Sequence, residues 1–180
     1  MSGPKIEESR GAIRWVVLIL MSLVIFANYY LYDCFSTLKG TLQTELGASS
    51  TQWGLIRNFY NVPNTFLFKD LLWGIILDRF GIRRTGFVFT TLCALGGINK
   101  AYGVSDAFRA GGFGYSFMSS FLPDYSPELK MMMFGRLLFG LGAETQIVML
   151  NKVLAKWFMG LELALAFGLY LGFARGGSAL

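Results

Sequence analysis

The sequence predicts an all-α integral membrane protein with about five transmembrane helices, and three observations lead to this fold class. Charged residues make up only 15% of the chain and hydrophobic residues 54%, whereas soluble domains usually carry about a quarter charged residues. Apolar stretches long enough to cross a bilayer recur along the chain. The basic residues gather in the connections between these stretches, as Lys and Arg do in the cytoplasmic loops of membrane proteins.

The first transmembrane helix is predicted over residues 15–37. Residues 15–32 read WVVLILMSLVIFANYYLY and contain no charged residue, which is enough for most of a membrane crossing at 1.5 Å per residue. The preceding polar segment, residues 1–14, carries the basic residues Lys5, Arg10 and Arg14. We therefore expect the N-terminus to face the cytoplasm-like side, and residues 15–180 to form one transmembrane domain.

Four further helices follow from the remaining apolar stretches. They are predicted over residues 51–77, 85–104, 129–153 and 162–180. The first of them contains Pro63, which membrane helices tolerate as a kink. The segment from residue 106 to residue 127 is rich in Gly, Ser and Phe, which indicates a loop or a partly interfacial segment.

Basic residues in the other connections agree with this topology. Arg79, Arg83 and Arg84 fall between the second and third helices, and Lys152 and Lys156 between the fourth and fifth. Both connections then lie on the same side as the N-terminus, as the bias of Lys and Arg toward the cytoplasm requires.

Composition excludes several classes of function. The chain has no histidine, which removes the usual general base and the usual metal ligand. Cys34 and Cys93 stand singly in or beside apolar runs, as packing residues do. The net charge is +5, but the basic residues form no stripe of the kind that binds nucleic acid. We expect no enzyme activity, no catalytic residues, no cofactor, no metal and no nucleic-acid partner.

The connection between the second and third predicted helices has the pattern G-x-x-x-D-R-x-G-x-R-R. Its residues are Gly74, Asp78, Arg79, Gly81, Arg83 and Arg84. The first glycine allows close approach of helices, the second gives a tight turn, and the arginines hold the loop on the cytoplasmic face. Any short basic loop would explain the arginines alone, but not the acid and the glycines at this spacing.

This pattern resembles the signature loop of the major facilitator superfamily. Further stretches are similar to the branch of that superfamily that contains the lysosomal dipeptide uniporter. They read FANYYLYD, YNVPN, FGRLLFGLGAET and KWFMGLELALAFGLYLGFARGGS. They occur in the expected order, and the resemblance implies the N-terminal part of a facilitator bundle.

The resemblance also implies a pair of charged residues near a central cavity, an acid in the fourth helix and an arginine in the fifth. Here they are Glu144 and Arg175. Counted along their helices, the two lie within roughly 5 Å of the same depth. A charge at that depth usually faces a cavity or a partner. A zwitterionic peptide would place its amine toward Glu144 and its carboxylate toward Arg175, and the alternative is a structural bridge without substrate.

Other polar residues of the membrane helices are candidates for the same cavity. They are Asn28, Tyr29, Tyr32 and Asp33 in the first helix, and Tyr60 and Asn64 in the second. The alternative is that they join helices, as polar residues in membrane helices commonly do. Structural roles are expected for the charged residues Arg136, Lys69 and Asp70, the last two pairing within the protein or with another chain.

Two hypotheses of function remain. A facilitator has two six-helix halves with substrate between them, and this chain supplies about five helices. The main hypothesis is a shortened relative that does not transport by itself and is an accessory subunit of a larger membrane complex, for example a respiratory complex of the mitochondrial inner membrane. The other is a fragment of, or a protomer in, a carrier of dipeptides or similar small organic solutes, in the lysosome, another endomembrane or the plasma membrane.

The expected partners are the lipid bilayer and other transmembrane helices. The latter would pack on glycine-rich helix faces formed by Gly140, Gly142, Gly168, Gly172 and Gly176.

Overall fold

The computed structural model describes residues 4–66, 69–158, 160 and 162–179, and the side chains of residues 4–11 and 69–71 lie outside the described part. Its described residues form helices and connections, with no strand among them. The chain divides into two compact units, one of residues 1–37 with 149–180 and one of residues 38–148. Each unit is described by itself.

Ten helices are described. They are α1 (Pro4–Thr37), α2 (Lys39–Leu46), α3 (Ser50–Phe59), α4 (Val62–Phe66), α5 (Lys69–Phe80), α6 (Ile82–Gly103), α7 (Asp106–Arg109), α8 (Tyr115–Ser119), α9 (Pro127–Phe158) and α10 (Leu163–Ala179). Within this described part, Ala12–Thr37 and Pro127–Phe158 are long and apolar enough to cross a membrane. The 17 residues of α10 span about 25 Å at 1.5 Å per residue, less than a hydrocarbon core of about 30 Å.

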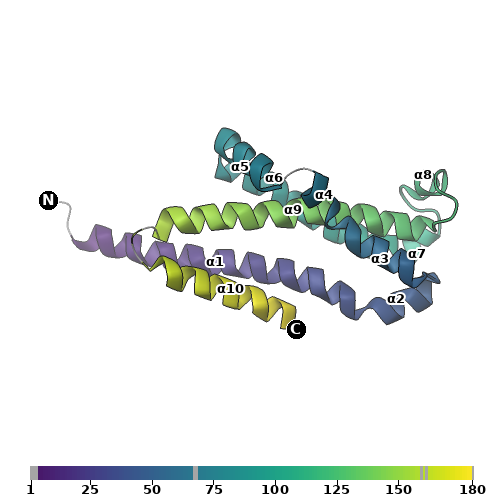
Figure 1. The fold of residues 1–180 in the computed structure, drawn as a ribbon, viewed down its shortest axis with the longest axis horizontal. Coiled ribbons are helices and arrows are strands. Elements are labelled where there is room, and N and C mark those ends of the chain that lie inside the picture. Colours follow the sequence, from purple (N-terminus) through teal and green to yellow (C-terminus); the bar gives the residue numbers. More distant parts are fainter. Residues whose placement is uncertain (1–3, 67–68, 159, 161, 180) are drawn as a thin grey trace. The chain divides into compact units, whose positions relative to one another are not determined.

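The first unit consists of α1 and α10, which run parallel and side by side, with the end of α9 (Figure 1). Arg14 of α1 and Glu162, the residue before α10, form an ion pair at 3.4 Å. Further along, a Cβ built on Gly177 would lie 3.1 Å from the carbonyl carbon of Phe26. The absence of a side chain at this glycine therefore lets the two backbones meet.

α1 begins earlier than the sequence predicts. The prediction places a polar segment over residues 1–14, whereas the helix starts at Pro4. Proline is well tolerated at the first position of a helix, because its missing N–H would have no partner there. The helix thus begins at Pro4 and includes the polar residues 4–14.

The second unit contains α2 to α8 and the first part of α9. The helix predicted over residues 51–77 is interrupted in the structure, where α3 ends at Phe59 and α4 begins at Val62. Pro63 explains this break: it has no N–H to donate to Phe59, and its ring clashes with that carbonyl. Residues 67 and 68, between α4 and α5, lie outside the described part.

α3 itself begins with a capping box, in which Ser49 and Gln52 exchange side chain to backbone hydrogen bonds.

α6 and the first part of α9 pack closely in an antiparallel pair. Gly96 and Gly103 of α6, and Gly135 and Gly142 of α9, are each seven residues apart and face the partner helix. A Cβ on Gly142 would lie 2.6 Å from the carbonyl oxygen of Phe89. Small residues at this spacing let membrane helices approach to backbone contact. This pair forms the scaffold of the candidate site.

Candidate functional site

A buried acid of α9 is the centre of the candidate site. The Tyr60 hydroxyl donates a hydrogen bond of 2.7 Å to Oε1 of Glu144. Both residues are buried, Tyr60 being 8% and Glu144 9% exposed. Burying a carboxyl group costs free energy unless the group is hydrogen-bonded. The hydrogen bond from Tyr60 therefore offsets part of the cost of burying Glu144.

The break in the second predicted helix positions Tyr60. Tyr60 is the C-terminal cap of α3 and lies in the turn that Pro63 imposes. A Cβ built on Gly140 would lie 3.1 Å from the carbonyl carbon of Tyr60 and 3.2 Å from its Cα. Gly140 therefore provides the space in which the backbone of Tyr60 rests on α9, one turn before Glu144.

Arg136 completes the group on the same face of α9. Arg136, Gly140 and Glu144 are spaced by four residues, so they lie one above the other along the helix. The guanidinium carbon of Arg136 lies 5.6 Å from the centroid of the Tyr60 ring, within the range of a cation–π contact. We call Tyr60, Arg136 and Glu144 the Tyr60 cluster. Arg136 is fully buried, and the structural role expected for it stays a prediction.

A second cation borders the cluster. The rings of Tyr60 and Phe139 have their centroids 6.0 Å apart, and Nζ of Lys100 lies 3.9 Å from the centroid of Phe139. Lys100 is only 8% exposed. Sequence analysis missed Lys100 and Phe139; the signal for the lysine is its place in the last turn of an apolar helix, directly after Asn99.

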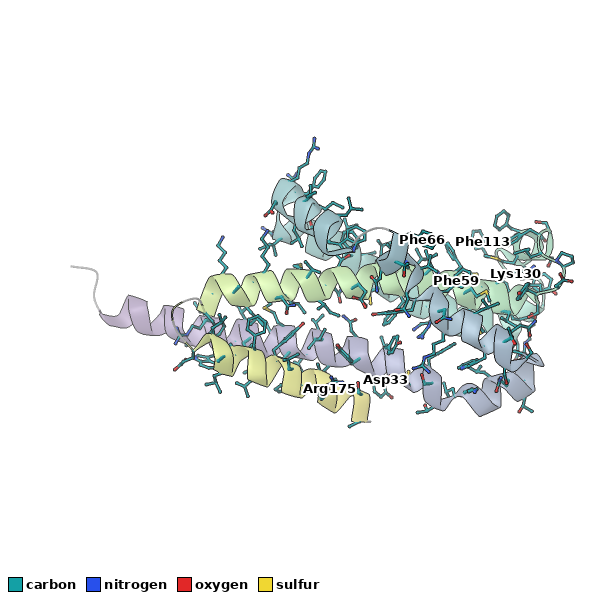
Figure 2. All side chains as sticks on the ribbon, in the orientation of Figure 1. Asp33, Phe59, Phe66, Phe113, Lys130 and Arg175 are labelled. Atoms are coloured by element: carbon teal, nitrogen blue, oxygen red, sulfur yellow. The ribbon has the colours of Figure 1, made fainter. Side chains whose placement is uncertain are left out.

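The predicted pairing of Glu144 with Arg175 stays a prediction. Glu144 lies in the second unit and Arg175, an exposed residue near the end of α10, in the first (Figure 2). Glu144 accepts a hydrogen bond from Tyr60, a residue that the sequence had placed only as a cavity lining.

The remaining predicted cavity residues are distributed over both units. On α1, Asn28 is buried, whereas Tyr29, Tyr32 and Asp33 are half-buried. On α4, Asn64 is half-buried and its Oδ1 is enclosed without a hydrogen-bond partner in the described part. Substrate binding by any of these residues stays a prediction.

The signature loop forms the turn between α5 and α6. Gly81 has φ +78°, a conformation that favours glycine, so the tight turn predicted for it is present. Trp73 of α5 packs edge-on against Phe89 of α6 with ring centroids 5.0 Å apart. Asp78 and the three arginines, Arg79, Arg83 and Arg84, are exposed.

The glycines expected at helix contacts fall into two groups. A Cβ on Gly74, Gly168 or Gly172 would meet no atom of the described chain within 4 Å, so contacts of these three with other helices stay a prediction. Gly140 and Gly142 were expected to contact helices of another protein. In the structure they contact the backbone of this chain. The side chains of Lys69 and Asp70 lie outside the described residues.

The chemistry of the site is that of polar recognition. Among the described residues, no three His, Cys, Asp or Glu side chains gather to hold a metal ion. The site offers a buried carboxylate, a hydroxyl and two cations held over aromatic rings. Such groups bind and orient charged solutes by hydrogen bonds and charge.

Comparison with known proteins identifies relatives. The family model of the Major Facilitator Superfamily matches residues 21–180. The lysosomal dipeptide transporter MFSD1 of Homo sapiens is 32% identical over 175 residues, which are 97% of this chain and 33% of the human protein. The same transporter of Danio rerio is 32% identical over 93% of this chain and 32% of its own length. The uncharacterized transporter YybO of Bacillus subtilis (strain 168) is 25% identical over 89% of this chain and 31% of its own length.

These relatives bear on the two hypotheses of function. The chain spans about a third of the length of the curated relatives it matches. Their names describe transporters rather than enzymes or subunits of a respiratory complex. The comparisons therefore favour the carrier hypothesis and give no support to an accessory subunit or to a mitochondrial location. No solved structure gives a significant match.

Proposed function

Because the chain belongs to the Major Facilitator Superfamily, we propose that it forms part of a carrier that moves dipeptides or similar small organic solutes by alternating access. The observation that carries this proposal is the buried hydrogen bond between Tyr60 and Glu144. The relatives named as lysosomal dipeptide transporters support the substrate class, and a lysosomal or other endomembrane location with it.

Glu144 is proposed to receive the amine of the solute. A carboxylate offers about four lone-pair sites for hydrogen bonds, so one carboxylate can accept from the Tyr60 hydroxyl and from an ammonium group together. Fixing a charged group by a neutral donor restricts its rotation before the solute arrives, which lowers the entropic cost of binding.

Arg175 is proposed to receive the carboxylate of the solute. A guanidinium binds a carboxylate through two parallel hydrogen bonds, and Arg175 is exposed on α10. In this proposal the chain crosses the membrane five times, with its N-terminus and the loop of residues 79–84 on the cytoplasmic side.

The chain is proposed to supply one wall of the transport path. Alternating access needs one bundle to rock against another around the solute. The solute would bind between the helices of this chain and a second bundle, which the longer relatives have room to contain. Gly168 and Gly172, which are open in the described part, are proposed as contacts for helices outside it.

Ligand-dependent thermal stability tests the proposal on the protein expressed from its complete gene. A dipeptide of two alanines at 100 times its Kd stabilises the protein by about 2.7 kcal/mol. This corresponds to a rise in Tm of about 5–11 °C for a protein of 150–250 residues, and to a smaller rise for a longer chain. Glu144→Gln should abolish the rise, whereas the control Glu128→Gln, on the same helix, should keep it. An N-acetylated dipeptide that stabilises the wild-type protein equally would contradict the role of Glu144.

A further inference from the structure

The connection between α6 and α9 exposes an apolar surface. Phe113 is 90% exposed, Phe117 68%, Leu122 58% and Phe121 38%. We call these four residues the connector patch. Single exposed apolar residues are ordinary, but a continuous apolar surface marks a site that contacts a protein or a membrane.

A small packed core holds the connector patch in place. Phe108, Met118 and Met131 are buried together, with Tyr102 and Tyr115 packed against them. The ring of Phe108 makes edge contacts with both tyrosines at centroid distances of 5.4 Å. Since successive helix residues are rotated by about 100°, Phe117 of α8 points away from its neighbour Met118. Its exposure thus follows from the packing of α8 onto this core.

Lys130 provides hydrogen-bond partners for backbone carbonyl groups of the connector patch. Its ammonium group donates hydrogen bonds to the carbonyl oxygens of Phe121 and Leu122 and lies 4.8 Å from the centroid of the Phe121 ring. Lys130 is only 6% exposed, and Figure 2 shows it at the start of α9 beside the segment that carries Phe113. Two carbonyls in the turn are thereby satisfied, which is what contact with an apolar medium requires.

The position of the connector patch in the chain indicates its partner. α9 begins at Pro127, five residues after Leu122, and this helix is apolar and long enough to cross a membrane. The patch therefore lies in the connection at one end of a helix that can cross the bilayer, where the chain meets the membrane interface. Exposed charged residues, Asp106, Arg109 and Asp124, flank it, and they are suited to the headgroup region.

We propose that the connector patch inserts into the membrane interface, between lipid headgroups and acyl chains, at the end of α6 and the start of α9. Phe and Leu side chains form the apolar face of segments that lie in this interface, where that face is buried at the boundary of headgroups and acyl chains. The insertion fixes the level of both helices in the bilayer. It depends on the membrane location of the chain and not on the solute that is carried.

Spin-label depth measurement in lipid nanodiscs tests this proposal on the full chain. The labels are introduced as Phe113→Cys and Phe117→Cys in a background of Cys34→Ala and Cys93→Ala, with Asp106→Cys as the matched control on the same connection. Collisions with oxygen, which concentrates in lipid, should increase relative to collisions with a water-soluble nickel complex at both aromatic positions. The control should show the opposite ratio.

A second variant keeps the aromatic character of the patch. Phe117→Trp should add fluorescence that is blue-shifted relative to water and quenched by lipids brominated near the top of the acyl chain. Labels at positions 113 and 117 as accessible to nickel as the control would overturn the proposal. Shielding from both reagents, as when a protein or a second copy covers the patch, would also overturn it.

Discussion

Replacing Gly96 by alanine should destabilise the protein, whereas the same change at its neighbour Gly97 should not. A Cβ at position 96 would lie 2.7 Å from the carbonyl oxygen of Gly135 and 2.7 Å from Cα of Phe139. These are backbone atoms of α9, which cannot move aside as a flexible side chain can. A Cβ at position 97 would meet no described atom within 4 Å.

The magnitude follows from two opposing terms. Overpacking of a well-packed interior costs about 1–3 kcal/mol, and contact with backbone places Gly96→Ala near the upper value. Alanine recovers about 1 kcal/mol over glycine in a helix interior. The net cost is then about 2 kcal/mol, which lowers Tm by about 4–8 °C for 150–250 residues. Gly97→Ala should leave Tm unchanged or raise it.

Thermal unfolding in detergent, followed by circular dichroism, measures both variants against the wild type. A preserved helix content at low temperature serves as the control for folding. Equal Tm values for the two variants would refute the close packing of α6 against α9, and with it the position of the helix face that carries the Tyr60 cluster.

Three further changes have defined outcomes. Tyr60→Phe removes the donor to Glu144 and should cost about 1.5–3 kcal/mol of unfolding free energy, the range for hydrogen bonds to charged groups; an unchanged midpoint in chemical denaturation would argue against this contact. Glu162→Gln removes an exposed ion pair and should change the same midpoint by at most about 1 kcal/mol. Cysteines introduced at Arg84 and Asp106 should react with an impermeant reagent from opposite sides of the membrane, and reaction from one side would contradict the proposed topology.

The sequence predicts features of the fold that are set by neighbouring residues better than features that are set by contacts between distant residues. Long apolar stretches identified the segments that contain α1, α6, α9 and α10 as helical, and α1 and α9 are long and apolar enough to cross a membrane. The break after Phe59 could not be distinguished from a kink, because proline in a membrane helix is compatible with either. The backbone of Tyr60 in this turn rests against Gly140, a distant residue that no local pattern links to Pro63.

The candidate site shows the same limit. Glu144 was found from its charge in an apolar helix and from the family pattern, and Tyr60 was placed near it as a cavity residue. Their direct hydrogen bond joins residues 84 positions apart, and no local pattern encodes such a pairing. Gly140 and Gly142 were correctly read as contact residues, but the sequence does not state that the contact lies within the same chain.

Counterflow exchange of a dipeptide tests the central claim, that this chain is part of a solute carrier, most directly. The protein expressed from its complete gene is reconstituted in liposomes loaded with unlabelled dipeptide, and labelled dipeptide is added outside at low concentration. Alternating access predicts a transient accumulation of label above its equilibrium level, which Glu144→Gln abolishes. Entry of label at the rate seen in protein-free liposomes, with no transient accumulation, would contradict the carrier assignment.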